Sequence, residues 1–437
     1  MDWPTRPIKE LCRIEKGAIG ITKAKPGPYP LVTLAEERKE HNDYQFDTKA
    51  VIIPLVSSTG HGHASIKRIH YQEGKFTVGT ILCAVVPNNE SELHPLFLYH
   101  YLDVFKEQLL VPLMRGMANV TLPMRSLGDL EIPVPPIDDQ LVWIEKFKSV
   151  NHKETKLLNA LSNQQTLLKQ LRQAILQEAV QGKLTEHWRA AHPEVEPASA
   201  LLERIQAEKA RLVKEKKIKK SKPLPPITPN EIPFDLPEGW VWCRLCDLGI
   251  VTGGGTPSKG NLNFWNGPIP WVSPKDMKCE TVSDSELKIT PEGVANSSAK
   301  LVPEGSLLIV GRSGILKRKI PVAINSVECT VNQDMKVLIP YLKSMNKYLQ
   351  IMLFGLENYI LRNLIKFGMT VHSLKYKEFE QQPFPIPPIV EQKLIVDKIE
   401  SLLAKASALE QEVQQNQQYA EQLLQSVLRE VMNPVSV

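Results

Sequence analysis

An internal repeat constrains this 437-residue chain more than any other feature of its sequence. A proline-rich motif and the acidic-Gln pair behind it occur twice, 252 residues apart: Pro133–Ile137 with Asp139-Gln140, and Pro385–Ile389 with Glu391-Gln392. Further pairs in the same ungapped register are Gly116-Met117 with Gly368-Met369, and Gln170-Leu171 with Gln422-Leu423. Such a repeat predicts two equivalent domains, each followed by the same kind of segment.

The starts of the two domains resemble each other at a second offset. The segment from Trp3 to Leu11 resembles that from Trp240 to Leu248, which lies 237 residues later. The two domains therefore differ in length between their starts and their shared ends. Their interiors, residues 12–108 and 249–360, share little sequence. The pattern is a common frame around divergent interiors.

A long amphipathic helix is predicted after each proline motif. In the first copy, apolar residues recur at spacings of three, four and seven from Leu141 to Leu176, behind a capping Asp138 or Asp139. Such a stripe is too long for a small domain to cover, so we expect an antiparallel helix pair; the alternative is that each helix folds back on its own domain. The stripe residues predicted at the helix or partner interface are Leu157, Leu161, Leu168, Leu171, Leu409, Val413, Leu423 and Val427.

These features predict an α+β chain: two mixed α/β domains in a pseudo-twofold tandem repeat, joined by two long antiparallel helices. The expected boundaries are 1–137 for the first domain, 138–184 for the first helix, 185–235 for a helical, basic and proline-rich connector, 236–388 for the second domain and 389–437 for the second helix. No run of about 18 apolar residues and no leader sequence occur, which predicts a cytoplasmic protein without membrane spans.

The sequence lacks the usual catalytic and metal-binding signatures. Gly253–Lys259 has the wrong spacing for a phosphate loop, and neither Pro-Pro pair has the neighbours of an amino-methyltransferase motif. Cys243 and Cys246 form a CxxC, but in the strand predicted over 240–248 they would point to opposite faces. His61 and His63 occupy a polar loop without a nearby carboxylate, so no metal is expected there either.

Both domains instead offer hydrogen-bonding side chains on glycine-bearing loops, the groups that contact base edges and phosphates. The second domain is basic, with 17 Lys and Arg against 13 Asp and Glu over 237–384, whereas residues 1–134 carry 15 of each. The candidate DNA-binding residues of the first domain are Ser57, Ser58, Thr59, His61, His63, Lys67, Arg68, Arg115 and Asn119. Those of the second are Thr256, Ser258, Lys259, Lys275, Arg312, Ser313, Lys317, Arg318 and Lys319.

Several segments carry a resemblance to a known family. They are Leu236–Trp242 with Asp247–Gly249, Thr252–Ser258, Leu301–Leu308 with Arg312–Gly314, Leu168–Leu176 with Gly182–Leu184, and the two proline motifs. With these segments the chain resembles the specificity (S) subunits of type I restriction-modification systems (the HsdS family). The resemblance is weakest over residues 12–110, where the Gly-Thr-Pro-Ser signature of the second domain is absent.

The resemblance implies two target recognition domains, each reading one half of a split double-stranded DNA site, with the helices setting the spacer. It also implies two methyltransferase (M) subunits that hold AdoMet, and two restriction (R) subunits that use ATP and Mg²⁺, with no cofactor and no catalysis in this chain. The expected role is to direct N6-adenine methylation and restriction. The alternatives are an orphan subunit that redirects other methyltransferases, a coiled-coil scaffold without DNA readout, and a fused nuclease-methylase.

Overall fold

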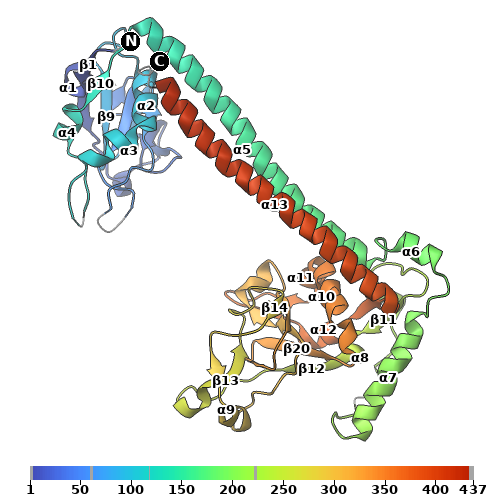
Figure 1. The fold of residues 1–437 in the computed structure, drawn as a ribbon. Helices are drawn as coiled ribbons and strands as arrows, with labels where there is room; N and C mark the ends of the chain where they lie inside the picture. Colours follow the sequence, from blue (N-terminus) through green and yellow to red (C-terminus); the bar gives the residue numbers. More distant parts are fainter. Residues whose placement is uncertain (1–2, 60–62, 118, 221–223, 433–437) are drawn as a thin grey trace. The chain divides into compact units, whose positions relative to one another are not determined.

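The computed structural model describes residues 3–59, 63–117, 119–220 and 224–432, except the side chains of residues 154, 424, 425 and 428–432. The chain forms two compact units (Figure 1): the first contains residues up to 163 and those from 413 onward, and the second contains residues 164–412. Each unit combines helices with β-sheets, in agreement with the predicted α+β class. No helix in the described ranges is long and apolar enough to cross a membrane.

The first unit is built on two four-stranded sheets, ordered β2-β9-β6-β7 and β4-β3-β8-β5, and on the pair β1-β10. Its core contains the inner faces of these strands and of α2. Its elements are β1 (Thr5–Pro7), α1 (Ile8–Leu11), β2 (Cys12–Lys16), η1 (Ile21–Lys23), β3 (Tyr29–Val32), β4 (Lys39–His41), β5 (Phe46–Asp47), β6 (Ala50–Pro54), β7 (His70–Gln72), β8 (Lys75–Val78), β9 (Leu82–Pro87), α2 (Pro95–Val104), α3 (Lys106–Leu109), η2 (Val111–Leu113), α4 (Met124–Gly128), β10 (Glu131–Pro133) and the start of α5 (Ile137–Val180).

The second unit has a five-stranded sheet, β12-β20-β16-β18-β14, and the smaller sheets β15-β13-β19, β17-β22-β21 and β11-β23. After the end of α5, its helices are α6 (Glu186–Ala191), α7 (Ala198–Lys214), η3 (Pro229–Glu231), α8 (Leu245–Leu248), η4 (Leu262–Phe264), α9 (Pro291–Ala295), η5 (Gly314–Lys317), η6 (Lys343–Met345), α10 (Asn346–Gly355), α11 (Glu357–Asn363), α12 (Tyr376–Gln381) and α13 (Ile389–Met432). Its strands are β11 (Val241–Arg244), β12 (Gly249–Gly253), β13 (Trp265–Val272), β14 (Thr281–Val282), β15 (Lys288–Ile289), β16 (Leu307–Val310), β17 (Arg312–Ser313), β18 (Val322–Asn325), β19 (Thr330–Val331), β20 (Met335–Pro340), β21 (Ile365–Lys366), β22 (His372–Leu374) and β23 (Pro383–Ile386).

A two-stranded antiparallel ribbon joins the start and the end of each domain. In the first unit Thr5 of β1 faces Pro133 of β10, and in the second Trp242 of β11 faces Pro385 of β23. Thr5 and Trp242 are related by the 237-residue offset, whereas the two prolines are related by the 252-residue offset. The ribbon therefore pairs one strand from each offset, with the same register in both units. The difference in length between the two domains lies in the loops and strands that connect the two ribbon strands.

The glutamine of each repeated motif holds the proline turn onto the helix that follows. Gln140 donates from Nε2 to the carbonyl of Pro135 at 2.8 Å, and Gln392 donates to the carbonyl of Pro387 at 2.9 Å. Both glutamines are buried. Because the buried amide N–H of each glutamine finds its partner in the proline turn, we infer that this motif residue has a structural role.

The two long helices, α5 and α13, each have 44 residues. Within the second unit the end of α5 lies antiparallel to the start of α13: Arg172 donates to Ser407 Oγ at 2.9 Å, and Lys398 donates to the carbonyl of Leu184 at 2.9 Å. The helix α5 ends four residues before the predicted boundary, since Gly182, at φ +73°, forms a Schellman turn.

The predicted leucine stripe is only partly buried. Leu161 is buried, and Leu168, Val413 and Val427 are half-buried. Leu157, Leu171, Leu409 and Leu423 are exposed by 45–65%. In the second unit small and polar residues occupy the contact instead, with Ala406 only 2% exposed beside the Arg172–Ser407 bond. A contact through short side chains shifts the buried face of the helix away from the leucines that periodicity selects.

The strand predicted over 240–248 is wrong beyond Arg244. There β11 ends and the short helix α8 begins, because a helical turn places both Leu245 and Leu248 in the core of the second unit, where neither is exposed. Cys243 therefore lies in a strand and Cys246 in a helix. Burial raises the pKa of the Cys243 thiol to about 12 and that of Cys246 to about 11, so both thiols stay protonated at neutral pH.

We expect His100 to make the stability of the first unit dependent on pH. Its ring lies 3.9 Å from that of Phe147, and burial, with a smaller effect of Lys148, lowers its pKa to about 4. The folded state thus binds its proton less readily than the unfolded state, whose histidine titrates near the ordinary 6.5. The stabilisation is complete above pH 6.5 and is lost as the pH falls toward 4, by about 2 kcal/mol between pH 7 and pH 5.

Urea unfolding of the first unit at pH 7 and pH 5 tests this prediction. His70 also has a pKa lowered to about 4, so we expect His100→Gln to remove about half of the pH dependence. His152→Gln, at an exposed position, is the matched control and should leave the pH dependence intact. Equal pH dependence in wild type and His100→Gln would contradict the assignment.

Candidate nucleic-acid interface

The first unit carries a polar loop whose hydroxyl groups are tied to one another. Ser57 Oγ donates to the carbonyl of His63 at 2.5 Å, and Thr59 Oγ1 lies 3.0 Å from Ser65 Oγ. The backbone N–H of Lys67 donates to Ser58 Oγ at 2.9 Å. The loop is therefore organised by its own side chains, with Ser58, Thr59, His63 and Lys67 at the surface.

A hairpin from a distant part of the sequence lies against this loop. Arg115 and Thr121 exchange two backbone hydrogen bonds of 2.8 Å, and the N–H of Ser57 donates to the carbonyl of Val120 at 3.0 Å. The structure thereby brings Arg115 and Asn119, both exposed, beside the Ser57 loop. The two groups of candidate residues predicted in the first domain form one surface.

Two further residues predicted to bind DNA in the first domain are not placed on this surface as free side chains. His61 lies outside the described residues. Arg68 is half-buried and bonds to Glu36 at 3.1 Å, so its guanidinium already has a carboxylate partner. Arg68 would have to leave that partner in order to contact DNA.

In the second unit, residues from six loops and strand ends line an open cleft of about 580 Å³. Four predicted DNA-binding residues meet there: Lys259, Lys275, Arg312 and Ser313. They come from segments up to 54 residues apart, and β17 presents the last two. Among the described residues, none of the three cations forms an ion pair, which leaves them available to phosphates or base edges.

The cleft also contains acidic side chains, and among them Asp276 is fixed by three hydrogen bonds. It accepts from the N–H and the hydroxyl of Ser273, both at 2.8 Å, and from the N–H of Glu286 at 2.9 Å. These bonds stabilise the turn that presents Lys275. Carboxylates in such a cleft can accept from the amino group of cytosine, so the mixed lining suits base reading better than simple charge attraction.

Sequence reasoning missed one segment of the cleft, Asn332-Gln333-Asp334. It joins β19 to β20, and Gln333 Oε1 accepts from Thr256 Oγ1, which ties the Gly-Thr-Pro-Ser segment to the cleft. A signal was present, since three consecutive polar residues interrupt two apolar strands. Asn and Gln are also the residues that pair with adenine edges.

Five predicted residues of the second domain lie outside the cleft lining, and one of them, Thr256, bonds to Gln333 of that lining. Lys317, Arg318 and Lys319 are exposed at the end of η5, and the carbonyl of Ser258 accepts from Trp265 Nε1 at 3.1 Å.

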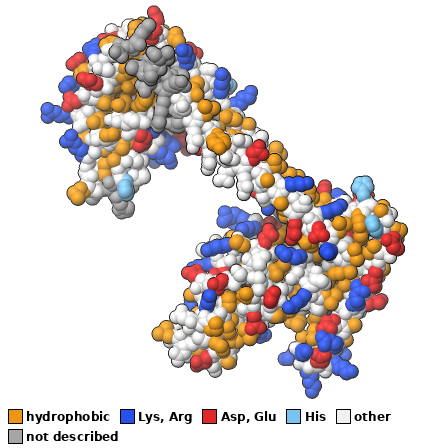
Figure 2. All heavy atoms as spheres, viewed as in Figure 1, with side chains coloured by type: hydrophobic (Ala, Val, Ile, Leu, Met, Phe, Trp, Pro, Cys, Tyr) orange, Lys and Arg blue, Asp and Glu red, His pale blue; other side chains and the backbone are white. Residues whose placement is uncertain are grey.

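The connector contains the helix α7, which buries Leu201 and Ile205 against the second unit. The outer face of this helix carries charges of both signs (Figure 2). Part of that charge is paired, because Arg211 bonds to Glu208 at 2.6 Å.

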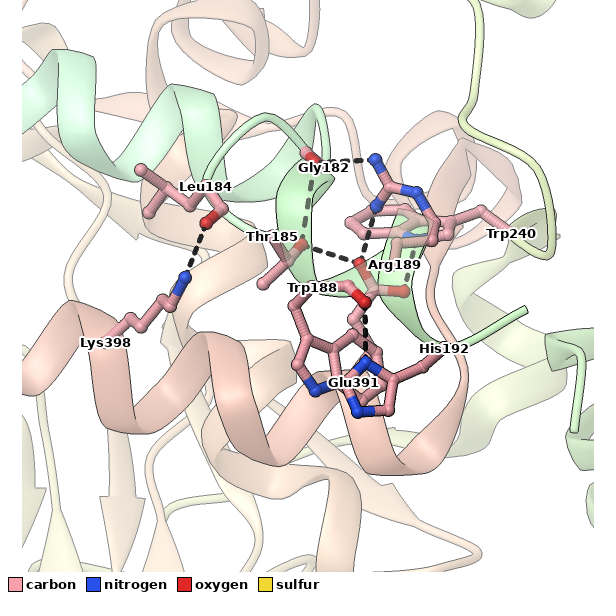
Figure 3. A network of polar contacts seen from close by, with 9 residues as sticks. All are labelled: Gly182, Leu184, Thr185, Trp188, Arg189, His192, Trp240, Glu391 and Lys398. Atoms are coloured by element: carbon pink, nitrogen blue, oxygen red, sulfur yellow. Dashed lines mark hydrogen bonds and ion pairs between the residues drawn. The ribbon is translucent and has the colours of Figure 1, made fainter. Parts of the chain in front are cut away.

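A buried carboxylate joins the helix ends to the second domain (Figure 3). The side chain of Glu391, at the start of α13, is 0% exposed and accepts from Thr185 Oγ1 and Arg189 Nη1 at 2.6 Å and from Trp240 Nε1 at 2.8 Å. Arg189 also donates to the carbonyl of Gly182 at 2.9 Å. The network therefore ties the end of α5, α6 and the domain start to α13.

The first unit has no copy of this network among its described residues. Asp139, which the 252-residue offset relates to Glu391, is exposed. The cleft beside the network, about 720 Å³, is lined by α6 and by the prolines around Gly239. The part of the chain that the structure describes contains no cluster of three or more His, Cys, Asp or Glu placed to hold a metal ion.

Comparison with known proteins finds one family over both halves of the chain. The model for the type I restriction modification DNA specificity domain matches residues 1–177 and 237–418. The chain is 45% identical over 170 residues to the Escherichia coli type I restriction enzyme EcoR124I/EcoR124II specificity subunit, a match that covers 38% of this chain and 42% of that protein. It is 34% identical over 255 residues to the Escherichia coli EcoAI specificity subunit, covering 55% and 40% respectively.

These matches span only about two fifths of the length of either relative. A solved structure from work on the complex assembly and conformational transition of the type I R-M system superposes with a TM-score of 0.65 at 17% identity, over 99% of this chain and 98% of that chain. At that identity the superposition establishes the fold.

Proposed function

The chain belongs to the family of type I restriction-modification DNA specificity proteins, and from that premise we propose that it is the subunit that selects the DNA sequence. In this proposal each domain reads one half of a bipartite site. The observation that carries it is the contrast between the two units. A repeated ribbon and helix frame presents a hydroxyl-rich loop in one unit, and a cleft lined by Lys259, Lys275 and Arg312 in the other.

The mechanism follows from what these side chains can bind. Cations and exposed backbone N–H groups contact phosphates and set the register of the protein on the duplex. Arg312, Gln333 and the neighbouring carboxylates have the donor and acceptor patterns that distinguish base pairs in the major groove. Since the two units expose different groups, the two half-sites differ in sequence.

The domain boundaries and partners are part of the same proposal. Residues 1–137 and 236–388 are the target recognition domains, 138–184 and 389–437 the helices, and 185–235 the connector. Two M subunits with AdoMet contact the helices, where Leu157, Leu171, Leu409 and Leu423 leave apolar surface exposed. Two R subunits supply ATP- and Mg²⁺-dependent restriction, and this chain contributes recognition in the cytoplasm but no catalysis.

Methylome sequencing tests the proposed function. Cells that carry this chain with its candidate M subunit should show a bipartite N6-methyladenine motif that is absent without the chain. Cells with other M subunits tell whether the chain acts as an orphan. A stable chain–M complex that yields no such motif would refute sequence selection and favour the scaffold.

Changing the length of both long helices is expected to change the spacer of the site. Seven residues inserted after Asn163 and after Glu412 keep the helical phase and add roughly 10 Å. That length corresponds to about three base pairs of duplex at 3.4 Å each. The methylome should then show the same half-sites with a longer spacer, whereas insertion into one helix alone should abolish modification. An unchanged spacer in the double insertion would rule out the helices as the ruler.

A further inference from the structure

Each unit carries a hairpin loop built around a Gly-Met pair, at positions related by the 252-residue offset. In the first unit, Arg115 and Thr121 close the loop with their backbone bonds around Gly116-Met117. In the second, β21 and β22 pair antiparallel on either side of Gly368-Met369. These loops lie just beyond the divergent interiors, residues 12–108 and 249–360, where the register shared by the two copies begins.

The glycine of each loop makes a similar close contact with the backbone. A Cβ atom on Gly116 would lie 2.4 Å from the carbonyl oxygen of Asn119, and one on Gly368 would lie 2.4 Å from that of Val371. In both loops the carbonyl oxygen of the residue three positions later lies so close to the glycine that a side chain with a Cβ atom would clash with it. Gly116 also has φ +123°. The repeat has therefore kept a glycine that the backbone approaches closely, although Gly368 does not share the positive φ of Gly116.

In both loops the methionine side chain is fully exposed to solvent. The relative exposure of Met117 is 95% and that of Met369 is 105%, and Phe367 beside it is 63% exposed. The Phe367 ring packs edge-on against His372, whose Nδ1 accepts from the N–H of Gly368 at 3.3 Å. Folding normally buries such side chains, so an apolar tip kept exposed at both equivalent positions indicates a binding partner.

The surroundings of the loops indicate which partner this is. In the first unit the hairpin is bonded to the Ser57 loop, with Arg115 at its base. In the second, β22 pairs with β17 so that Arg312 faces Ser373, and Val371 lines the cleft that holds Lys259 and Lys275. Each methionine therefore lies beside a surface whose cations form no ion pair within the described part of the chain, which suits a polyanion better than an apolar protein face.

We propose that Met117 and Met369 are wedges, one for each half-site, that insert at a base step of the bound DNA. This inference rests on the proposed function and deepens it. An apolar side chain at a base step unstacks the bases locally and opens the duplex to the reading residues around it. The unbranched, polarisable methionine can adapt to different steps, which explains why the wedge is shared while the reading loops differ.

Fluorescence of 2-aminopurine, placed at successive positions of each half-site away from the methylated adenine, tests the wedge in the complete chain–M complex. Wild type should raise the fluorescence at one step in each half-site. Met117→Ala should remove the signal in one half-site and Met369→Ala in the other, each with a roughly tenfold rise in Kd. Ile21→Ala and Leu301→Ala, at exposed apolar positions of the same units, are controls expected to stay within about twofold of wild type.

Each result separates the wedge from the proposed function. If the wild-type complex binds its bipartite site while both methionine variants keep the signal and the affinity, the wedge is refuted and sequence selection stands. If the variants lose association with the M subunit at normal thermal stability, the loops are protein-docking sites and the wedge is refuted. If the wild-type complex selects no site, both proposals fail together.

Discussion

Replacing Glu391 by alanine should lower the free energy of unfolding of the second unit by about 3–5 kcal/mol, the cost of leaving one partner of a buried ion pair alone. The carboxylate accepts from three side chains at 2.6–2.8 Å and is 0% exposed. Without it, the Arg189 guanidinium, whose side chain is 18% exposed, loses its counter-ion. Trp240 Nε1 and Thr185 Oγ1 lose their acceptor as well, and buried donors without partners are costly.

Denaturant unfolding followed by tryptophan fluorescence measures this loss, because Trp188 and Trp240 both lie at the network. Glu391→Gln keeps an acceptor oxygen but removes the charge, so we expect an intermediate loss. The matched control is Asp139→Ala, the exposed counterpart in the first unit, which should change stability by less than about 0.5 kcal/mol. If Glu391→Ala unfolds at the same denaturant concentration as Asp139→Ala, the network does not stabilise the junction.

Replacing Arg312 by alanine should relax the choice of one base in the half-site read by the second domain. A good bidentate contact contributes about 1–3 kcal/mol of discrimination, which corresponds to roughly 5- to 150-fold in relative modification rate. Arg312 lines the cleft with Lys259 and Lys275, and its backbone is fixed by a 2.9 Å bond to the carbonyl of Asp334. The other half-site should be read as before, since its residues belong to the first unit.

The measurement is the methylation rate of the chain–M complex on duplexes that carry each single substitution in the bipartite site. Arg312→Lys keeps the charge without the guanidinium fork and should retain affinity while losing most of the discrimination. Arg318→Ala, exposed but outside the cleft lining, is the control. A uniform weakening over all duplexes would instead make Arg312 a phosphate contact.

The repeated ends of the two domains and the long helices could be predicted, because short-range sequence patterns or the internal repeat indicate them. The helices α5 and α13 begin within one residue of the predicted boundaries, since a proline motif precedes each of them. The predicted cap at Asp138 or Asp139 was wrong, because α5 already begins at Ile137 and both aspartates lie in its first turn. Their predicted contact face was less accurate, because Leu171 and Leu409 are exposed while Ala406 is buried. Periodicity marks which residues are apolar, but the packing distance between two backbones decides which of them meet.

The candidate interface was predicted as residue types rather than as a surface. The sequence gives no reason to place Arg115 beside Ser57, and only the hydrogen bond from the Ser57 N–H to the Val120 carbonyl shows that their loops are adjacent. The segment Asn332-Gln333-Asp334 was missed because it lies far in sequence from Lys259, although both line the same cleft. Glu391 was a motif residue without a role, since its partners Thr185, Arg189 and Trp240 lie 151 to 206 residues away.

The sequence by itself determined the duplicated frame, the two long helices and the divergence of the interiors, because repeats and periodicity depend on residues near one another or in matching register. The tertiary structure alone decided that the two offsets meet in one ribbon, that a cleft gathers Lys259, Lys275 and Arg312, and that one buried carboxylate serves one junction only. Those features depend on contacts between distant segments, which chain closure and packing select and which no local pattern encodes.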